Sequence, residues 1–227
     1  MKPWLTRRTG RPWAWPSAAV QRRLGWLLLL LLALPWMRQA LESRMGLHML
    51  VQLPALMLCG FLMAAKPSHG AQTLSPAAGA GVKVFNAHVI TGLCWVAVVL
   101  GLSMVPRVLD LAAGVLWVDA CKYLLVVLCG MAWRRSWRAA GLVLQAFFLG
   151  NVLPMMAVVG FLYQEANWRV CNAYGLADQQ RTGELMVTSA AVLGLLWLLG
   201  AARKLVQNET GATSVRALQG WHQPSGR

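Results

Sequence analysis

The sequence predicts an all-α membrane protein, a bundle of about six transmembrane helices with both termini on the cytoplasmic side. Of its 227 residues, 58% are hydrophobic and only 12% are charged, which is too apolar for an ordinary soluble domain. The apolar residues form long runs separated by basic clusters, and each run approaches the roughly 20 residues that cross about 30 Å of hydrocarbon as a helix. The net charge of +14 is therefore interpreted as a topology signal rather than as a nucleic-acid-binding surface.

The apolar runs define the expected helices in chain order. The first, 24–40, has the flanking arginines and short apolar core of a signal peptide, but no small-residue cleavage pattern follows Met37, so we expect a retained helix. The others are expected at 45–65, 84–105, 111–133, 139–163 and 185–202. The chain then divides into a basic N-terminal segment (1–23), a six-helix membrane domain (24–202) and a C-terminal tail (203–227), with both end segments cytoplasmic.

The basic residues set the orientation of this bundle. With the N-terminus inside, about fifteen Lys and Arg fall in cytoplasmic segments. Only five fall in the outer loops, namely Arg38, Arg44, Arg107, Arg169 and Arg181. Positive charge is retained on the cytoplasmic side of membrane proteins, and a missing or extra helix would destroy this bias.

Soft metal ligands gather near the start of the second segment. Met45, His48, Met49 and Gln52 are related by steps of three and four, so they share a broad face of a helix. Thioether and imidazole groups together suit copper, particularly Cu(I). Methionine is also a routine membrane-helix residue, and a single histidine can simply hydrogen-bond to a neighbouring helix. The spacing leaves both interpretations open.

The methionines are unevenly distributed between the two halves of the expected bundle. The outer half would hold Met37, Met45, Met49, Met104, Met155, Met156 and Met186, whereas the inner half would hold Met57, Met63 and Met131. This bias would place soft ligands on the side where a copper centre outside the cytoplasm is assembled. Met104 is the further candidate ligand.

Two charged residues, Asp119 and Lys122, lie inside the fourth segment. Charges in hydrocarbon are costly unless they pair or face a polar interior, and a spacing of three residues permits an ion pair within one helix. A structural pair is the favoured interpretation. A proton or ligand role is the alternative, in which Asp119 and Lys122 line a transport path with Gln145 and Asn151 of the fifth segment.

The last outer loop is the most polar part of the chain. Asp178 to Thr182 resembles a capped entry to the sixth helix, and the alternative is an outer-face docking or ligand site that includes Asp178 and Gln179. Cys171 is the one cysteine in a polar segment. It is either a reactive thiol or incidental, and no metal-ligand spacing surrounds it.

Two stretches resemble the CtaG-type assembly factors of haem-copper (cytochrome c) oxidases, a family of polytopic membrane proteins. MGLHMLVQLPALMLCG (45–60) is similar to that family's His-Met-rich helix, and LADQQRTGELM (176–186) is similar to its Asp-Gln-Gln loop. The order of helices and the Val105-Pro106-Arg107 turn fit the same plan, so the resemblance covers most of 24–202. This chain departs from the pattern at Gln52 and Lys122, where histidines would be expected.

The resemblance implies a non-enzymatic assembly factor in a bacterial inner membrane, with oxidase subunits as partners and copper as the metal. It implies His48 as the nitrogen ligand, with thioethers from Met45, Met49 and Met104. Alternatives from other classes are a small-solute or ion transporter or channel, and an accessory subunit of a respiratory membrane complex. The sequence shows no nucleophile-base pair, phosphate loop or paired carboxylates that would suggest an enzyme.

Overall fold

The computed structural model describes residues 16–65 and 89–220, with side chains described as far as Gln207. All regular structure in these residues is helical, which confirms the predicted all-α class. The elements are α1 (Ala18–Ala33), α2 (Pro35–Glu42), α3 (Met45–Leu47), the π-helical turn η1 (His48–Gln52), α4 (Leu53–Met63), α6 (Val89–Ser103), α7 (Pro106–Gly114), α8 (Leu116–Ala139), α9 (Leu142–Glu165) and α10 (Leu176–Gly220). Most of the predicted N-terminal segment 1–23 lies outside the described residues.

Four stretches of the described chain are long and apolar enough to cross a membrane on their own. They are Met45–Met63, Leu116–Ala139, Leu142–Glu165 and Leu176–Gln207. Two helix pairs, α1 with α2 and α6 with α7, pass the same test only together, and each pair is bent by 73°. The six expected segments therefore have six counterparts if each bent pair is one span. Large apolar side chains cover the outside of the bundle, as they do on a protein embedded in lipid.

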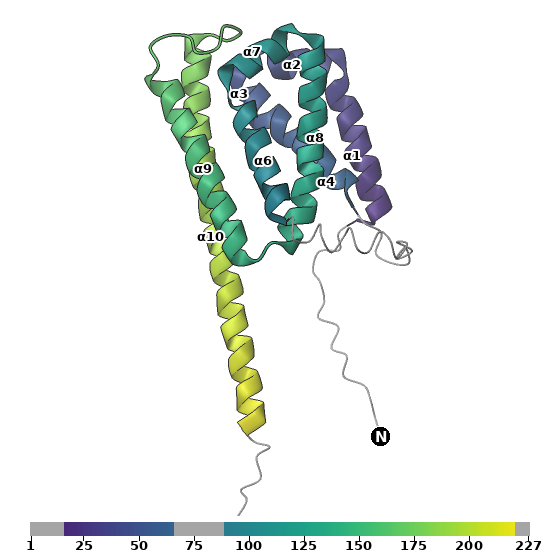
Figure 1. Cartoon of the computed structure of the whole chain (residues 1–227), viewed down its shortest axis with the longest axis vertical. Coiled ribbons are helices and arrows are strands. Elements are labelled where there is room, and N and C mark those ends of the chain that lie inside the picture. Colours follow the sequence, from purple (N-terminus) through teal and green to yellow (C-terminus); the bar gives the residue numbers. More distant parts are fainter. Residues whose placement is uncertain (1–15, 66–88, 221–227) are drawn as a thin grey trace, which may run out of the picture.

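Both bends occur where a proline begins the second helix of the pair. Pro35 and Pro106 cannot donate a backbone hydrogen bond, and each forces its preceding residue into an extended conformation, with ψ of 133° at Leu34 and 123° at Val105. The predicted first helix, 24–40, therefore starts six residues too late and is not one continuous helix. Its place is taken by α1, which begins at Ala18, and by α2, which turns away (Figure 1).

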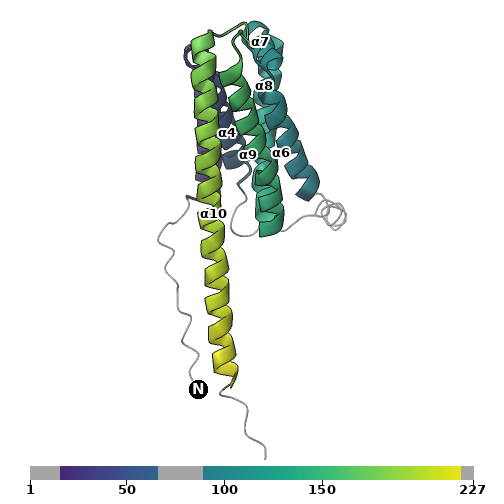
Figure 2. The ribbon, with the colours of Figure 1, turned by 90° about the vertical axis from the view of Figure 1, so that its left-hand side faces the viewer.

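The helices form two groups (Figures 1 and 2). In the first group, α8 packs along α4 and α6, and α1 packs along α4. In the second group, α9 and α10 pack on each other, and they contact the first group through α3 and α6. We call the end of the molecule that carries α2, α7 and the 166–175 loop the outer end, because the charge distribution predicts that it faces away from the cytoplasm.

Two glycines set the close approach of α4 to α8. A Cβ atom at Gly60 would overlap the carbonyl oxygen of Val127, and one at Gly130 would overlap the carbonyl oxygen of Met57. Small residues at helix crossings allow this backbone contact inside membranes. The α4–α8 contact fixes where the neighbouring η1 turn meets α8.

Helix α10 is much longer than the sixth apolar segment. It begins nine residues before the predicted start at residue 185 and continues to Gly220. The predicted tail (203–227) is therefore, as far as residue 220, a continuation of the same helix. The start of α1 and the far end of α10 lie at the same end of the molecule (Figure 1), as an even number of crossings requires.

Candidate functional site

The η1 turn directs two polar side chains into the bundle. The N–H of Leu53 reaches back five residues to the carbonyl of His48, and Pro54, which follows it, has no N–H to donate. This wider turn carries His48 and Gln52, both 0% exposed. Single π-helical turns inside membrane or soluble helices are rare and often coincide with functional sites.

Both ring nitrogens of His48 have partners from other segments. Nε2 lies 3.1 Å from Nζ of Lys122, and Nδ1 lies 2.7 Å from the hydroxyl of Tyr174. A lysine ammonium group can only donate, so Nε2 accepts, and Nδ1 carries the hydrogen that it donates to Tyr174. No lone pair of the imidazole is left free for a metal ion in this arrangement.

Lys122 belongs to a compact charge cluster, which we define as Arg38, Glu42, Asp119 and Lys122. The Lys122 ammonium lies 2.6 Å from Oδ1 of Asp119 and 3.1 Å from Oε1 of Glu42. Arg38 contacts the other oxygens of the same two carboxylates, at 3.1 Å and 3.4 Å. The predicted Asp119–Lys122 ion pair is present. It forms half of a cluster in which two cations balance two anions, so its net charge is zero.

Gln52 connects the charge cluster to α1. Its side-chain amide donates to Glu42 at 3.3 Å and to the hydroxyl of Tyr123 at 2.8 Å, and Tyr123 donates in turn to the carbonyl of Leu32 at 2.9 Å. Where the resembled family would have a second histidine, this chain places an amide donor. The polar network thus joins α1, α2, η1, α8 and the 166–175 loop.

A second cluster, rich in sulfur, lies beside the network at the outer end. We define the sulfur cluster as the buried Met45, Met49, Cys171 and Met186, with the partly buried Met104 and Met156 packed against it. These residues come from α3, η1, the 166–175 loop, α10, the end of α6 and α9. Five of the seven methionines predicted for the outer half lie in this cluster, and they include all three thioethers predicted as ligands.

The thiol of Cys171 is buried within this cluster. It is fully buried and donates to the carbonyl of Pro106 at 3.7 Å, and burial raises its pKa to about 12. Among the described residues, no three His, Cys, Asp or Glu side chains are placed to hold a metal ion together. A metal site at this end of the bundle would therefore have to rest mainly on methionine sulfur.

The two stretches that carry the family resemblance contact each other directly. The carboxylate of Asp178 accepts the backbone N–H of Met45 at 2.5 Å, and Gly46 packs against the hydroxyl of Thr182. We expected Asp178 to cap the sixth helix, but α10 begins earlier, at Leu176, and Asp178 caps the start of α3 instead. This contact holds α3 against α10.

Gln179 does not face outward as expected. It is 1% exposed, its Oε1 accepts the N–H of Val170 at 2.8 Å, and its amide donates to the carbonyl of Tyr163 at 3.2 Å. These bonds fix the 166–175 loop on the end of α9. Gln179 therefore positions the loop and is not reachable by a docking partner.

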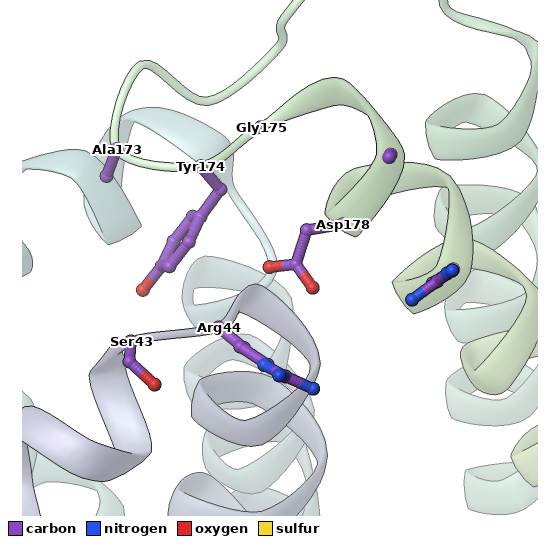
Figure 3. A pocket seen from close by; sticks show the side chains of 8 residues that line it. Ser43, Arg44, Ala173, Tyr174, Gly175 and Asp178 are labelled. Atoms are coloured by element: carbon purple, nitrogen blue, oxygen red, sulfur yellow. The ribbon is translucent and has the colours of Figure 1, made fainter.

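An open cavity of about 360 Å³, which we call the outer pocket, lies where this loop meets α3 (Figure 3). The side chains of Tyr174 and Asp178 lie on one side of it and Arg44 lies opposite. Burial raises the pKa of Tyr174, so its hydroxyl stays protonated. The lining residues are Ser43, Arg44, Ala173, Tyr174, Gly175, Ala177, Asp178 and Arg181.

The polar residues of the fifth segment do not join Asp119 and Lys122. Gln145 donates to the carbonyls of Trp137 and Ala140, near the other end of the bundle. Asn151 is exposed and donates to the carbonyl of Phe147 in its own helix. These separate positions disfavour a transport path built from the four residues.

Several residues of the site were not predicted from the sequence. Arg38 lies at the end of the first apolar run and Glu42 just after it, where loop residues are expected, although their spacing of four on a helix could have indicated an ion pair. Tyr123 and Tyr174 carry no local signal, because their partners lie in distant segments. The sequence gives no sign that Cys171 lies among methionines from other segments.

Comparisons with protein-family models, with curated proteins and with solved structures found no match for this chain. The multi-pass helical fold and the geometry of the site are therefore argued from the sequence and structure of this chain alone.

Proposed function

We propose that the chain is an assembly factor of a bacterial inner membrane, which holds Cu(I) as cargo and passes it at the outer end to a cytochrome c oxidase. The observation that carries the proposal is the sulfur cluster. Met45 and Met49 lie within one turn and Met186 lies in the distant helix α10, yet all three are buried in one cluster that also contains Tyr174 of the outer pocket. Soft thioethers select Cu(I), and the resemblance to the CtaG-type family supports the same role.

The copper ligands in this site are thioethers alone, and His48 is not among them. The Lys122 ammonium lies 3.1 Å from Nε2 of His48 and would oppose a cation there. His48 instead holds Tyr174 over the sulfur cluster. The neutral charge cluster fixes η1 against α8, and this keeps Met49 in place.

A Cu(I) titration of the purified full chain in nanodiscs tests the proposal. Protein and the chromophoric competitor bicinchoninate are mixed without oxygen, and the dissociation constant is read from the competitor's absorbance. The variant with Met45, Met49 and Met186 all changed to Leu should lose at least about tenfold in affinity, because leucine keeps the volume but has no sulfur. Met57→Leu is the matched control, since Met57 is equally buried but lies in the α4–α8 contact. Equal affinities for the triple and control variants would refute the site.

The pH dependence of the same titration separates thioether from thiolate ligands. Thioethers carry no proton, so the dissociation constant should stay constant between about pH 6 and 8. If Cys171 bound as a thiolate, each Cu(I) would release a proton, because the thiol pKa is raised to about 12. The affinity would then rise about tenfold per pH unit.

The client is tested in cells. A strain that carries the triple leucine variant should yield terminal oxidase with a lower copper-to-haem ratio than a strain that carries Met57→Leu. Full copper content in both strains would overturn delivery to an oxidase, even if the purified chain binds Cu(I).

A further inference from the structure

The outer pocket and the sulfur cluster share a wall. Tyr174 lines the pocket and also packs within the cluster. Asp178 lines the pocket and accepts the backbone N–H of Met45. One side chain, Tyr174, is therefore shared by the lining of the pocket and by the cluster that holds the buried sulfur atoms.

A second cavity also reaches this region but offers no route for a charged species. It measures about 160 Å³ and is lined mainly by apolar side chains of α6, α7 and α8. His48 and Lys122 form its polar edge, and the Lys122 ammonium already contacts Glu42, Asp119 and His48. The outer pocket is the polar opening of the two.

The rim of the outer pocket carries an excess of positive charge. Arg44 and Arg181 are exposed, and neither makes an ion pair among the described residues. Asp178 is the one lining carboxylate, and the hydrogen bond from the neutral N–H of Met45 leaves its charge in place, so the charged groups that line the pocket sum to one net positive charge. Two guanidinium groups raise the local concentration of anions, repel cations, and match carboxylate or phosphate groups in geometry.

We propose that the outer pocket is the port of the sulfur cluster, meaning the opening through which Cu(I) reaches the sulfur atoms. Arg44 and Arg181 favour entry of Cu(I) that is bound in an anionic complex over entry of Cu(I) as a cation. The inference rests on the proposed function and names the form of its cargo. In the transfer, Cu(I) leaves the donor's ligands and binds the thioether sulfurs, and the ligands return to solvent with their charge. The copper stays Cu(I), and no proton is moved.

Stopped-flow transfer rates test the port. The anionic donor is the Cu(I)–bicinchoninate complex, the cationic donor is Cu(I) in acetonitrile, and both are mixed with the full chain in nanodiscs at low salt. Arg44→Gln/Arg181→Gln should slow transfer from the anionic donor about tenfold or more, because such steering changes association rates by roughly 10 to 1,000-fold. The rate from the cationic donor should not fall, and the equilibrium dissociation constant should not change. Added salt should shrink the difference.

The control is Arg107→Gln/Arg169→Gln, which removes two exposed outer arginines away from the pocket and should leave both rates unchanged. Arg44→Glu/Arg181→Glu should slow the anionic donor further. An unchanged anionic rate in a variant that still binds Cu(I) would overturn the port and leave the proposed function standing. Equal slowing with both donors would overturn the selection by charge. Absence of Cu(I) binding in the unaltered chain would instead overturn the proposed function.

Discussion

Removal of Lys122 is the sharpest test of the charge cluster. Lys122→Met keeps a similar length but leaves Arg38 to face two carboxylates, whose side chains are 4% exposed at Asp119 and 11% exposed at Glu42. Breaking a buried ion pair typically costs about 3–5 kcal/mol. Because the ammonium contacts both carboxylates and also donates to His48, we expect the loss in unfolding free energy to lie at the upper end, about 4–5 kcal/mol.

The double variant distinguishes electrostatic from packing effects. Asp119→Asn alone leaves an excess cation and should cost about 3 kcal/mol. In Asp119→Asn/Lys122→Met, the remaining Arg38 and Glu42 balance each other, so the loss should be at least about 2 kcal/mol smaller than the sum of the single losses.

The free energies are measured by SDS titration of the protein in mixed micelles, followed by circular dichroism and tryptophan fluorescence. Arg169→Met is the control, since Arg169 is exposed and makes no ion pair within the part of the chain that the structure describes, and it should change stability by no more than about 0.5 kcal/mol. If the loss in the double variant equals the sum of the two single losses to within about 0.5 kcal/mol, the four charges do not act as one unit, and the reasoning fails.

Three further predictions concern packing, hydrogen bonding and thiol chemistry. Gly130→Ala should destabilise the protein by about 3 kcal/mol, because the new Cβ would meet the backbone of α4. Gly150→Ala is the control and should not destabilise the protein, since nothing lies within 4 Å of a Cβ atom there. Thermal unfolding in detergent measures both effects. Tyr174→Phe should cost about 1–3 kcal/mol in the same assay, since it leaves the Nδ1 hydrogen of His48 without its acceptor. In a variant that retains Cys171 as its one cysteine, maleimide labelling of the folded protein at about pH 8 should be at least a hundredfold slower than labelling of the unfolded protein. The reason is that a pKa raised to about 12 keeps the thiol protonated. Comparable labelling rates would contradict the burial of Cys171.

The overall architecture was predictable because hydrocarbon imposes length and polarity on each span. Apolar runs and basic clusters located six segments, and the Asp119–Lys122 pair followed from spacing alone. The bends were missed because the prediction treated each apolar run as one straight helix. Pro35 lies inside the first run and Pro106 directly follows the third, but a hydropathy pattern does not show by how much the chain turns at either proline.

The site was predictable only in part, for a different reason. The sequence placed His48 beside Met45 and Met49 because these lie within one turn. It could not indicate that Lys122 and Tyr174 occupy both nitrogens of the imidazole, since these contacts join residues 74 and 126 positions apart. The predicted ligand set therefore gave the imidazole of His48 a role that its neighbours oppose, and the role of the thioethers stays a prediction.

One unbroken helix, α10, connects the outer pocket to the opposite side of the membrane. Its 45 residues correspond to a rod of about 68 Å at 1.5 Å per residue, more than twice the roughly 30 Å of hydrocarbon. Asp178 and Arg181 stand at one end, and Gly160 and Gly183 lock the rod to α9 by a backbone-level contact. A partner that tilts or rotates the projecting end must therefore shift the cap on Met45 as well, so the rod gives the two sides of the membrane a mechanical connection without any moving loop between them.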